Sequence, residues 1–253
     1  SQAQNYDLLI RNGHVIDPKL GINGKRDIGI SNGKISRVAA TIPAGEAKKV
    51  IDASGMYVTP GLIDIHTHVF VGTRPEKFAD GVYSLSPDDF SFKSGVTTVV
   101  DAGTSGWRNF IKFKEQVIDR SQTRILAFLN IAGTGLSGKP DQENIEDMDP
   151  DATASMAREY SQIIVGIRIG HFEQPGWVPF DRALEAAGIA GKPLLVECHL
   201  PHLTLQEQLA KMRPGDIITH SFEQVSERMP VIDENGKLRP FVTEALKRGI
   251  HFD

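Results

Sequence analysis

The stretch from Val58 to Phe70 constrains this 253-residue chain more than any other part of it. An apolar run passes through a Pro-Gly pair and ends in two histidines, His66 and His68, which are separated by one residue. Side chains alternate between the two faces of a strand, so we expect both imidazoles on one face. Two neighbouring imidazoles can hold one divalent metal ion. The alternative is a pair of surface or hydrogen-bonded histidines at a strand end.

The pattern of hydrophobic residues changes at this stretch. Residues 6–57 contain short β-rich runs separated by Asn12-Gly13 and Asn32-Gly33, and Asn-Gly pairs between such runs are typical of hairpin turns. Residues 58–253 alternate buried strands with amphipathic helices, which is the pattern of a parallel sheet covered on both faces. We therefore predict a small β-sandwich-like domain over residues 1–57 and a β/α barrel over residues 58–253.

Seven strands are expected in the barrel, and the first of them carries the two histidines. The other six are Gly95–Ala102, Arg124–Ile131, Ile163–Gly170, Pro193–His199, Asp216–His220 and Gly249–Phe252. The helices expected between them are Trp107–Asp119, Asp151–Gln162, Asp181–Ala190, Leu205–Met212 and Val242–Arg248. A closed barrel of this type has eight strands, so we expect the sequence to be cut short before strand eight. The alternative is an open α/β fold.

Composition argues against several classes of protein. The formal charge is −4 and no cluster of lysine and arginine appears, which argues against a nucleic-acid partner. No apolar run is long enough to span a membrane, so a soluble protein is expected. The single cysteine, Cys198, excludes an intrachain disulfide. The first four residues fit a processed signal peptide as well as an ordinary terminus, so cytoplasmic and periplasmic locations both stay open.

The run Pro60-Gly-Leu-Ile-Asp64, followed by His66 and His68, resembles the first barrel strand of the amidohydrolase superfamily. Further segments are similar to its dihydroorotase-like deacetylase branch, and the similarity extends from residue 6 to the end: Thr97–Gly103, Thr123–Ile131, Ile164–Ile167, Arg213–His220, Asp233–Pro240 and His251–Asp253. The resemblance implies a TIM-type (β/α)8 barrel. It also implies hydrolysis of acyl amides or acetyl esters of small acids with one or two divalent ions. The family's catalytic aspartate is expected beyond residue 253, so no catalytic residue is assigned.

The same resemblance places candidate ligands on three further strands. His220 falls where the family has a histidine ligand, and Glu197 stands where the family has another histidine. On the fourth strand the family has a lysine whose carboxylated side chain bridges two metal ions, and this chain has Arg168. Arginine stays protonated and cannot carry that group. We therefore expect His66, His68, Glu197 and His220 to be the metal ligands, with zinc as the expected metal.

Two interpretations of Glu197 stay open. It is either a metal ligand, with the capacity to bridge two ions, or the partner of Arg168 in a buried ion pair. Arg168 also suits recognition of a substrate carboxylate, because its planar guanidinium donates paired hydrogen bonds. His199 shares the inward face with Glu197 and is the second candidate for substrate binding.

The sequence thus predicts a deacetylase-like metal-dependent hydrolase that acts on a small carboxylate-bearing substrate. No nucleic acid or membrane partner is expected, and a homo-oligomer is left open. One alternative is a cyclic amidase or a deaminase on the same scaffold. The other is a barrel that has lost catalysis together with the bridging lysine and now serves in binding. Metal content separates the binding protein from the enzymes, because a binding protein has no need of stoichiometric zinc.

Overall fold

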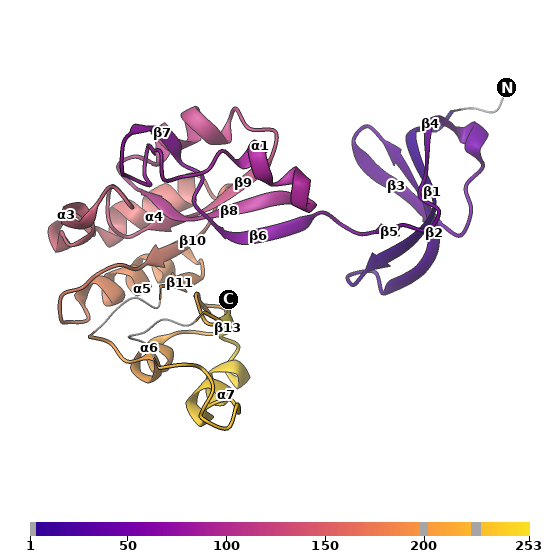
Figure 1. Cartoon of the computed structure of the whole chain (residues 1–253). Coiled ribbons are helices and arrows are strands. Elements are labelled where there is room, and N and C mark those ends of the chain that lie inside the picture. The colour runs from indigo at the N-terminus through magenta and orange to yellow at the C-terminus, as the bar shows by residue number, and fades with distance from the viewer. Residues whose placement is uncertain (1–3, 198–201, 224–228) are drawn as a thin grey trace. The chain divides into compact units, whose positions relative to one another are not determined.

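One long strand organises the N-terminal sheet (Figure 1). The computed structural model describes residues 4–197, 202–223 and 229–253, and the chain divides into two compact units after Leu62. The strands of the first unit are β1 (Tyr6–Asp17), β2 (Ile22–Ser31), β3 (Lys34–Ala39), β4 (Ala47–Asp52) and β5 (Tyr57–Val58). Their order is β3-β2-β1-β4, with β5 also paired to β1. A short 3-10 helix, Ala44–Glu46, precedes β4.

One of the two expected Asn-Gly hairpins is confirmed, and the other is wrong. Asn32 and Gly33 have φ angles of 52° and 70° and connect β2 to β3, as a tight hairpin turn requires. At Asn12 and Gly13 the chain does not turn. Strand β1 continues through a bulge there, because its register with β2 shifts between Ile10 and Gly13. The positive φ of Asn12, 65°, serves the bulge instead of a hairpin.

The second unit is built on a curled sheet of seven strands (Figure 1). Each strand from β8 to β13 pairs in parallel with the next in the chain. The order is β13-β12-β11-β10-β9-β8-β6. The bounds are β6 (Leu62–Thr67), β8 (Val96–Gly106), β9 (Arg124–Asn130), β10 (Ile164–Ile169), β11 (Leu194–Val196), β12 (Ile217–Ile218) and β13 (His251–Phe252). The prediction of a parallel, barrel-type sheet is therefore confirmed.

Helices and short segments connect these strands. They are β7 (Val71–Arg74), α1 (Pro87–Phe90), α2 (Phe110–Phe113), α3 (Lys139–Gln142), α4 (Pro150–Glu159), α5 (Val178–Ala190), α6 (Leu205–Lys211) and α7 (Pro240–Lys247), with 3-10 turns at Phe92–Ser94 and Ile145–Asp147. None of the helices in the described ranges is both long enough and apolar enough to cross a membrane.

Apolar side chains fill both sides of the curled sheet. The larger cluster includes residues of the strands and of α2, α4, α5, α6 and α7. A smaller cluster is made of Val100, Ala102, Phe128 and Leu195, which come from β8, β9 and β11. Burial on two faces explains why the strand sequences read as continuous apolar runs rather than as alternating ones. Such packing fixes the strand ends, from which the candidate site is built.

The largest local difference from the expected elements follows β8. This strand runs to Gly106 rather than ending at Ala102, and its register with β9 shifts between these two residues. The helix expected from Trp107 therefore begins only at Phe110, and its second half, Lys114–Ile118, is a π-helix. The extended end of β8 lies at the edge of the sheet where the candidate site is found.

Candidate metal centre

The candidate residues lie at the carboxyl ends of parallel strands. His66 is the last residue but one of β6, and His68 is the first residue after that strand. Arg168 is in β10, Glu197 directly follows β11, and His220 lies two residues beyond β12. Since the carboxyl ends of parallel strands meet at one edge of a sheet, the fold gathers residues that are far apart in the sequence.

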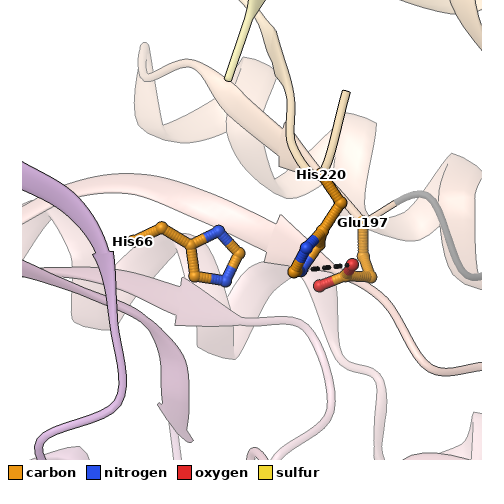
Figure 2. Close-up of side chains that lie close together, drawn as sticks. All are labelled: His66, Glu197 and His220. Carbon is orange, nitrogen blue, oxygen red and sulfur yellow. Dashed lines mark ion pairs between the residues drawn. The ribbon is translucent and has the colours of Figure 1, made fainter. Parts of the chain in front are cut away.

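Three of these side chains come within reach of one metal ion. One ligand atom each from His66, Glu197 and His220 lie within 4.8 Å of one another (Figure 2). The Nε2 atom of His220 is 2.9 Å from the Oε1 atom of Glu197. The imidazole rings of His66 and His220 have centroids 4.6 Å apart. Imidazole nitrogen and carboxylate oxygen are donors that zinc and similar divalent ions accept, so this set fits such an ion.

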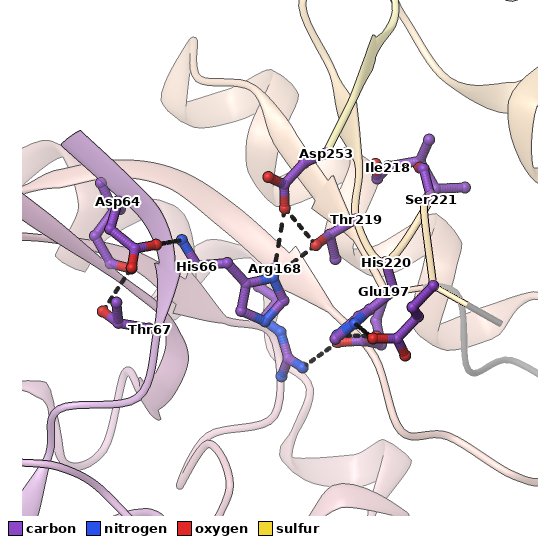
Figure 3. A network of polar contacts seen from close by, with 12 residues as sticks. Asp64, His66, Thr67, Arg168, Glu197, Ile218, Thr219, His220, Ser221 and Asp253 are labelled. Atoms are coloured by element: carbon purple, nitrogen blue, oxygen red, sulfur yellow. Dashed lines mark hydrogen bonds and ion pairs between the residues drawn. The ribbon is translucent and has the colours of Figure 1, made fainter. Parts of the chain in front are cut away.

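Glu197 is shared between this group and a buried cation. Its Oε2 atom accepts a hydrogen bond from Nη2 of Arg168 at 2.7 Å, while Oε1 faces His220 (Figure 3). Arg168 and Glu197 are both fully buried. An isolated charge at such depth is costly, and the pairing offsets that cost for each partner. Both interpretations of Glu197 thus find support in one geometry: the carboxylate is in the ligand group and also in an ion pair.

A hydroxyl group fixes the tautomer of His66. Its Nδ1 atom lies 2.6 Å from Oγ1 of Thr219, and the same hydroxyl donates its proton to Oδ2 of Asp253 at 2.6 Å (Figure 3). A hydroxyl carries one hydrogen, so Thr219 must accept from His66. Nδ1 of His66 therefore bears the proton, and Nε2 keeps the lone pair that a metal ion needs. Burial also lowers the pKa of His66, which favours the neutral ring.

His220 is oriented by two carboxylates. Its Nδ1 atom is 3.1 Å from Oε2 of Glu223, on the side opposite to its contact with Glu197. The hydrogen bond to Glu197, followed in size by burial that acts in the opposite sense, raises the pKa of His220. Its backbone has a φ of 58°, a left-handed conformation that is uncommon outside glycine. Strain of this kind is concentrated at functional sites.

His68 lies beside the ligand group but not within it. Its ring centroid is 5.6 Å from that of His66, and its Nδ1 atom is 2.8 Å from Oγ1 of Thr104. Burial, with the nearby charge of Arg168 as the next cause, lowers the pKa of His68 to about 3. The ring is therefore neutral at pH 7. The expectation that His68 and His66 share one ion stays a prediction.

Other residues support the candidate histidines without being candidate ligands. Thr219, Asp253 and Thr104 each contact a candidate histidine or its partner, yet none belongs to a recognisable ligand spacing. The carboxylate of Asp101 accepts from the backbone N–H of Thr104 at 2.7 Å, within the end of β8 that contacts His68. The other expected substrate-binding residue, His199, lies outside the described residues.

Comparison with known proteins gives the family. No protein-family profile matches the chain. It is 33% identical over 211 residues to a deacetylase of Agrobacterium fabrum, and 32% identical over 260 residues to a deacetylase of Enterococcus faecalis. A crystal structure of an adenine deaminase matches 98% of the chain with a TM-score of 0.81 and 31% identity. The chain belongs to the amidohydrolase superfamily.

A second amidohydrolase structure, of a dihydroorotase, matches 97% of the chain with a TM-score of 0.79 and 28% identity. The chain covers only part of these relatives. It spans 50% of the Agrobacterium deacetylase and 65% of the Enterococcus deacetylase, with 81% and 98% of its own residues matched. Of the two solved amidohydrolases it covers 65% and 64%.

Proposed function

We propose that the protein is a metal-dependent amidohydrolase that removes an acyl group from a small substrate by hydrolysis of an amide bond. The observation that carries this proposal is the group formed by His66, Glu197 and His220, whose ligand atoms lie within 4.8 Å of one another. Relatives named deacetylase match along 81% and 98% of the chain, which supports the reaction class. We further propose zinc as the metal, because the donors are imidazole and carboxylate.

The residues of the site would hold the ion as follows. His66 offers Nε2, because Thr219 takes the proton of Nδ1, and His220 offers Nε2, because Glu223 lies at its Nδ1. Glu197 offers Oε1. When bound, a divalent ion at these atoms polarises a substrate carbonyl and lowers the pKa of water toward neutrality. The hydroxyl and carboxylate partners keep each imidazole in the orientation and tautomer that binding requires.

The environment of Arg168 favours a substrate that carries a carboxylate. In the described part of the chain its Nε and Nη1 atoms are buried without a hydrogen-bond partner. Buried N–H groups of a cation are costly when they are left unsatisfied, and a substrate carboxylate would satisfy them. An N-acyl amino acid provides both such a carboxylate and an amide bond. Acylated hydroxy acids, which provide an ester instead, are the second substrate class to test.

A direct experiment compares acetate release with ring opening and with ammonia release. The zinc-loaded protein is incubated with N-acetyl amino acids, with a cyclic amide such as dihydroorotate, and with adenine. Acetate release alone supports the deacetylase proposal. Ring opening or ammonia release supports the alternatives named for the dihydroorotase and adenine deaminase relatives. Absence of all three products with a fully metal-loaded protein would favour a barrel that serves in binding.

The ligand assignment is tested separately from the reaction. His66→Ala removes one of the three ligand groups, so we expect most of the bound zinc to be lost while the fold is kept. His14→Ala is a matched control, because His14 lies in the N-terminal unit and its Nε2 contacts Asn23. Zinc is counted by elemental analysis and the fold is followed by circular dichroism. Full zinc content in His66→Ala would contradict the assignment.

A further inference from the structure

We infer that this site takes one divalent ion per chain rather than two, because Arg168 occupies the place of a second cation beside Glu197. The inference rests on the proposed function, since it requires a metal ion at His66, Glu197 and His220. Three features of the site carry it: how the Glu197 carboxylate is shared, how closely Arg168 is held, and how many charges surround the ligands.

The two oxygens of Glu197 serve different partners. Oε1 lies 2.9 Å from Nε2 of His220, inside the ligand group, and Oε2 is 2.7 Å from Nη2 of Arg168 (Figure 3). A carboxylate that bridges two metal ions in the usual way presents one oxygen to each. Here a guanidinium stands at the second oxygen, and it stays protonated at any ordinary pH. Glu197 is therefore arranged as a ligand of one ion, with a permanent cation at its other oxygen.

Two glycines hold this pair in place. A Cβ atom at Gly103 would lie 2.3 Å from Cδ of Arg168, so the backbone of β8 packs directly against the arginine side chain. A Cβ atom at Gly170 would lie 2.2 Å from Cβ of Glu197 and 3.3 Å from Nη2 of Arg168. Both side chains are also fully buried, so they are enclosed by closely packed atoms. We therefore expect the guanidinium to stay at Oε2 when a metal ion binds at Oε1.

The charged side chains that face the ligand imidazoles favour one divalent ion over two. Three carboxylates face the imidazole nitrogens of the ligand group: Glu197 at His220, Glu223 also at His220, and Asp253, whose Oδ2 is 3.5 Å from Nδ1 of His66. With the guanidinium of Arg168, these three carboxylates leave a formal charge of −2. One divalent ion neutralises that charge. A second ion would face the first ion and Arg168 in a buried site, where repulsion between cations is poorly screened.

The test is a metal count. The protein is saturated with zinc, equilibrated with buffer at low free zinc, and analysed for zinc and protein by elemental and amino-acid analysis. We expect one zinc per chain. Two zinc ions per chain would overturn this inference and leave the proposed function standing. No bound zinc would overturn both, so the two failures are distinguishable without any measurement of activity.

Variants at Arg168 test the cause. Arg168→Met removes the cation and frees Oε2 of Glu197, and His68 can add its Nε2 because Nδ1 already contacts Thr104. We expect this variant to take up more than one zinc, and to bind the first ion on the order of tenfold more tightly or better. Arg168→Lys keeps the charge and should stay at one ion. The exposed Arg158→Met, on α4, is the matched charge control.

Two results would overturn the role of Arg168. One is a single zinc with unchanged affinity in a folded Arg168→Met. The other is two zinc ions in Arg168→Lys, since that variant retains the cation. Should Arg168→Met fail to fold, the counts for the natural chain and for Arg168→Lys still decide, because each is predicted to be one.

Discussion

The Nδ1 atom of His66 and the Oγ1 atom of Thr219 lie 2.6 Å apart, and this contact joins the first strand of the barrel to the sixth. Because the Thr219 hydroxyl donates to Asp253, it acts as an acceptor toward His66. The carboxylate, the hydroxyl and the imidazole thus form a chain that leaves the Nε2 lone pair of His66 free of a proton. Hydrogen-bonded partners of this kind orient metal ligands and fix their tautomers.

Thr219→Val tests this relationship. The substitution keeps the shape of the side chain and removes the hydroxyl, so Nδ1 of His66 loses its acceptor. We expect zinc affinity to fall about 10–100-fold, as is usual when such a partner is lost. Thr219→Ser, which restores a hydroxyl, should recover most of it. Competition with a chromophoric chelator measures both. Equal affinities for the valine and serine variants would show that the hydroxyl does not orient the ligand.

Glu197→Gln tests the shared carboxylate. The variant loses an anionic metal ligand and leaves Arg168 buried without its ion-pair partner. We expect lower zinc content, and we expect the metal-free protein to be destabilised by roughly 3–5 kcal/mol. The exposed pair of Glu173 and Lys139 is the control, since loss of such a surface pair through Glu173→Gln costs about 1 kcal/mol or less. Urea unfolding with and without chelator gives both values. Unchanged stability and zinc content would contradict the account.

Gly170→Ala tests the close packing around that carboxylate. The added methyl group would overlap with the side chain of Glu197, so the strand or the ligand must shift. We expect weaker zinc binding and a loss of roughly 1–3 kcal/mol of stability. Gly188→Ala, in the last turn of α5, is the matched control, because there the new methyl meets only the end of a flexible arginine at 3.4 Å. Within a helix the same change is expected to stabilise by up to about 1 kcal/mol. Equal effects at the two glycines would refute the packing argument.

Asp101 gives a prediction for pH. Burial raises the pKa of this carboxyl to about 6 from a value of 3.8 in the unfolded chain. Between about pH 4 and pH 6 the folded state therefore holds a proton that the unfolded state has released. Stability from this group falls as pH rises through that window, by about 3 kcal/mol in total. Asp101→Asn should lack this slope. Denaturation of the chelator-treated protein at several pH values checks it, and parallel slopes for both proteins would contradict it.

Strand alternation explains why part of the site could be predicted from the sequence. His66, Arg168 and Glu197 stand at or beside the ends of strands that are strongly apolar, so their arrival at one edge of the sheet follows from the pattern alone. The role of Thr219 could not be predicted in this way. Its acceptor Asp253 is 34 residues away, after the paired strand β13, and its donor His66 is 153 residues away, at the opposite end of the strand order, so that the curvature of the sheet must bring it close.

The sequence could not predict either that Glu197 contacts two partners at once. Residue types allowed a metal ligand or an ion pair, and they do not reveal that each oxygen faces a different partner. Local backbone detail was also missed. The Asn12-Gly13 dipeptide has the composition of a hairpin turn. However, β1 is hydrogen-bonded to neighbouring strands both before and after this dipeptide, so the strand continues and the dipeptide forms a bulge.

The central claim is that one metal ion is bound by His66, Glu197 and His220. A crystal of the zinc-loaded protein, measured on both sides of the zinc absorption edge, tests it most directly. We predict a single anomalous peak about 2.0–2.2 Å from Nε2 of His66, Oε1 of Glu197 and Nε2 of His220. A peak without a bond to the Glu197 carboxylate, or no peak at this edge of the sheet, would contradict the account.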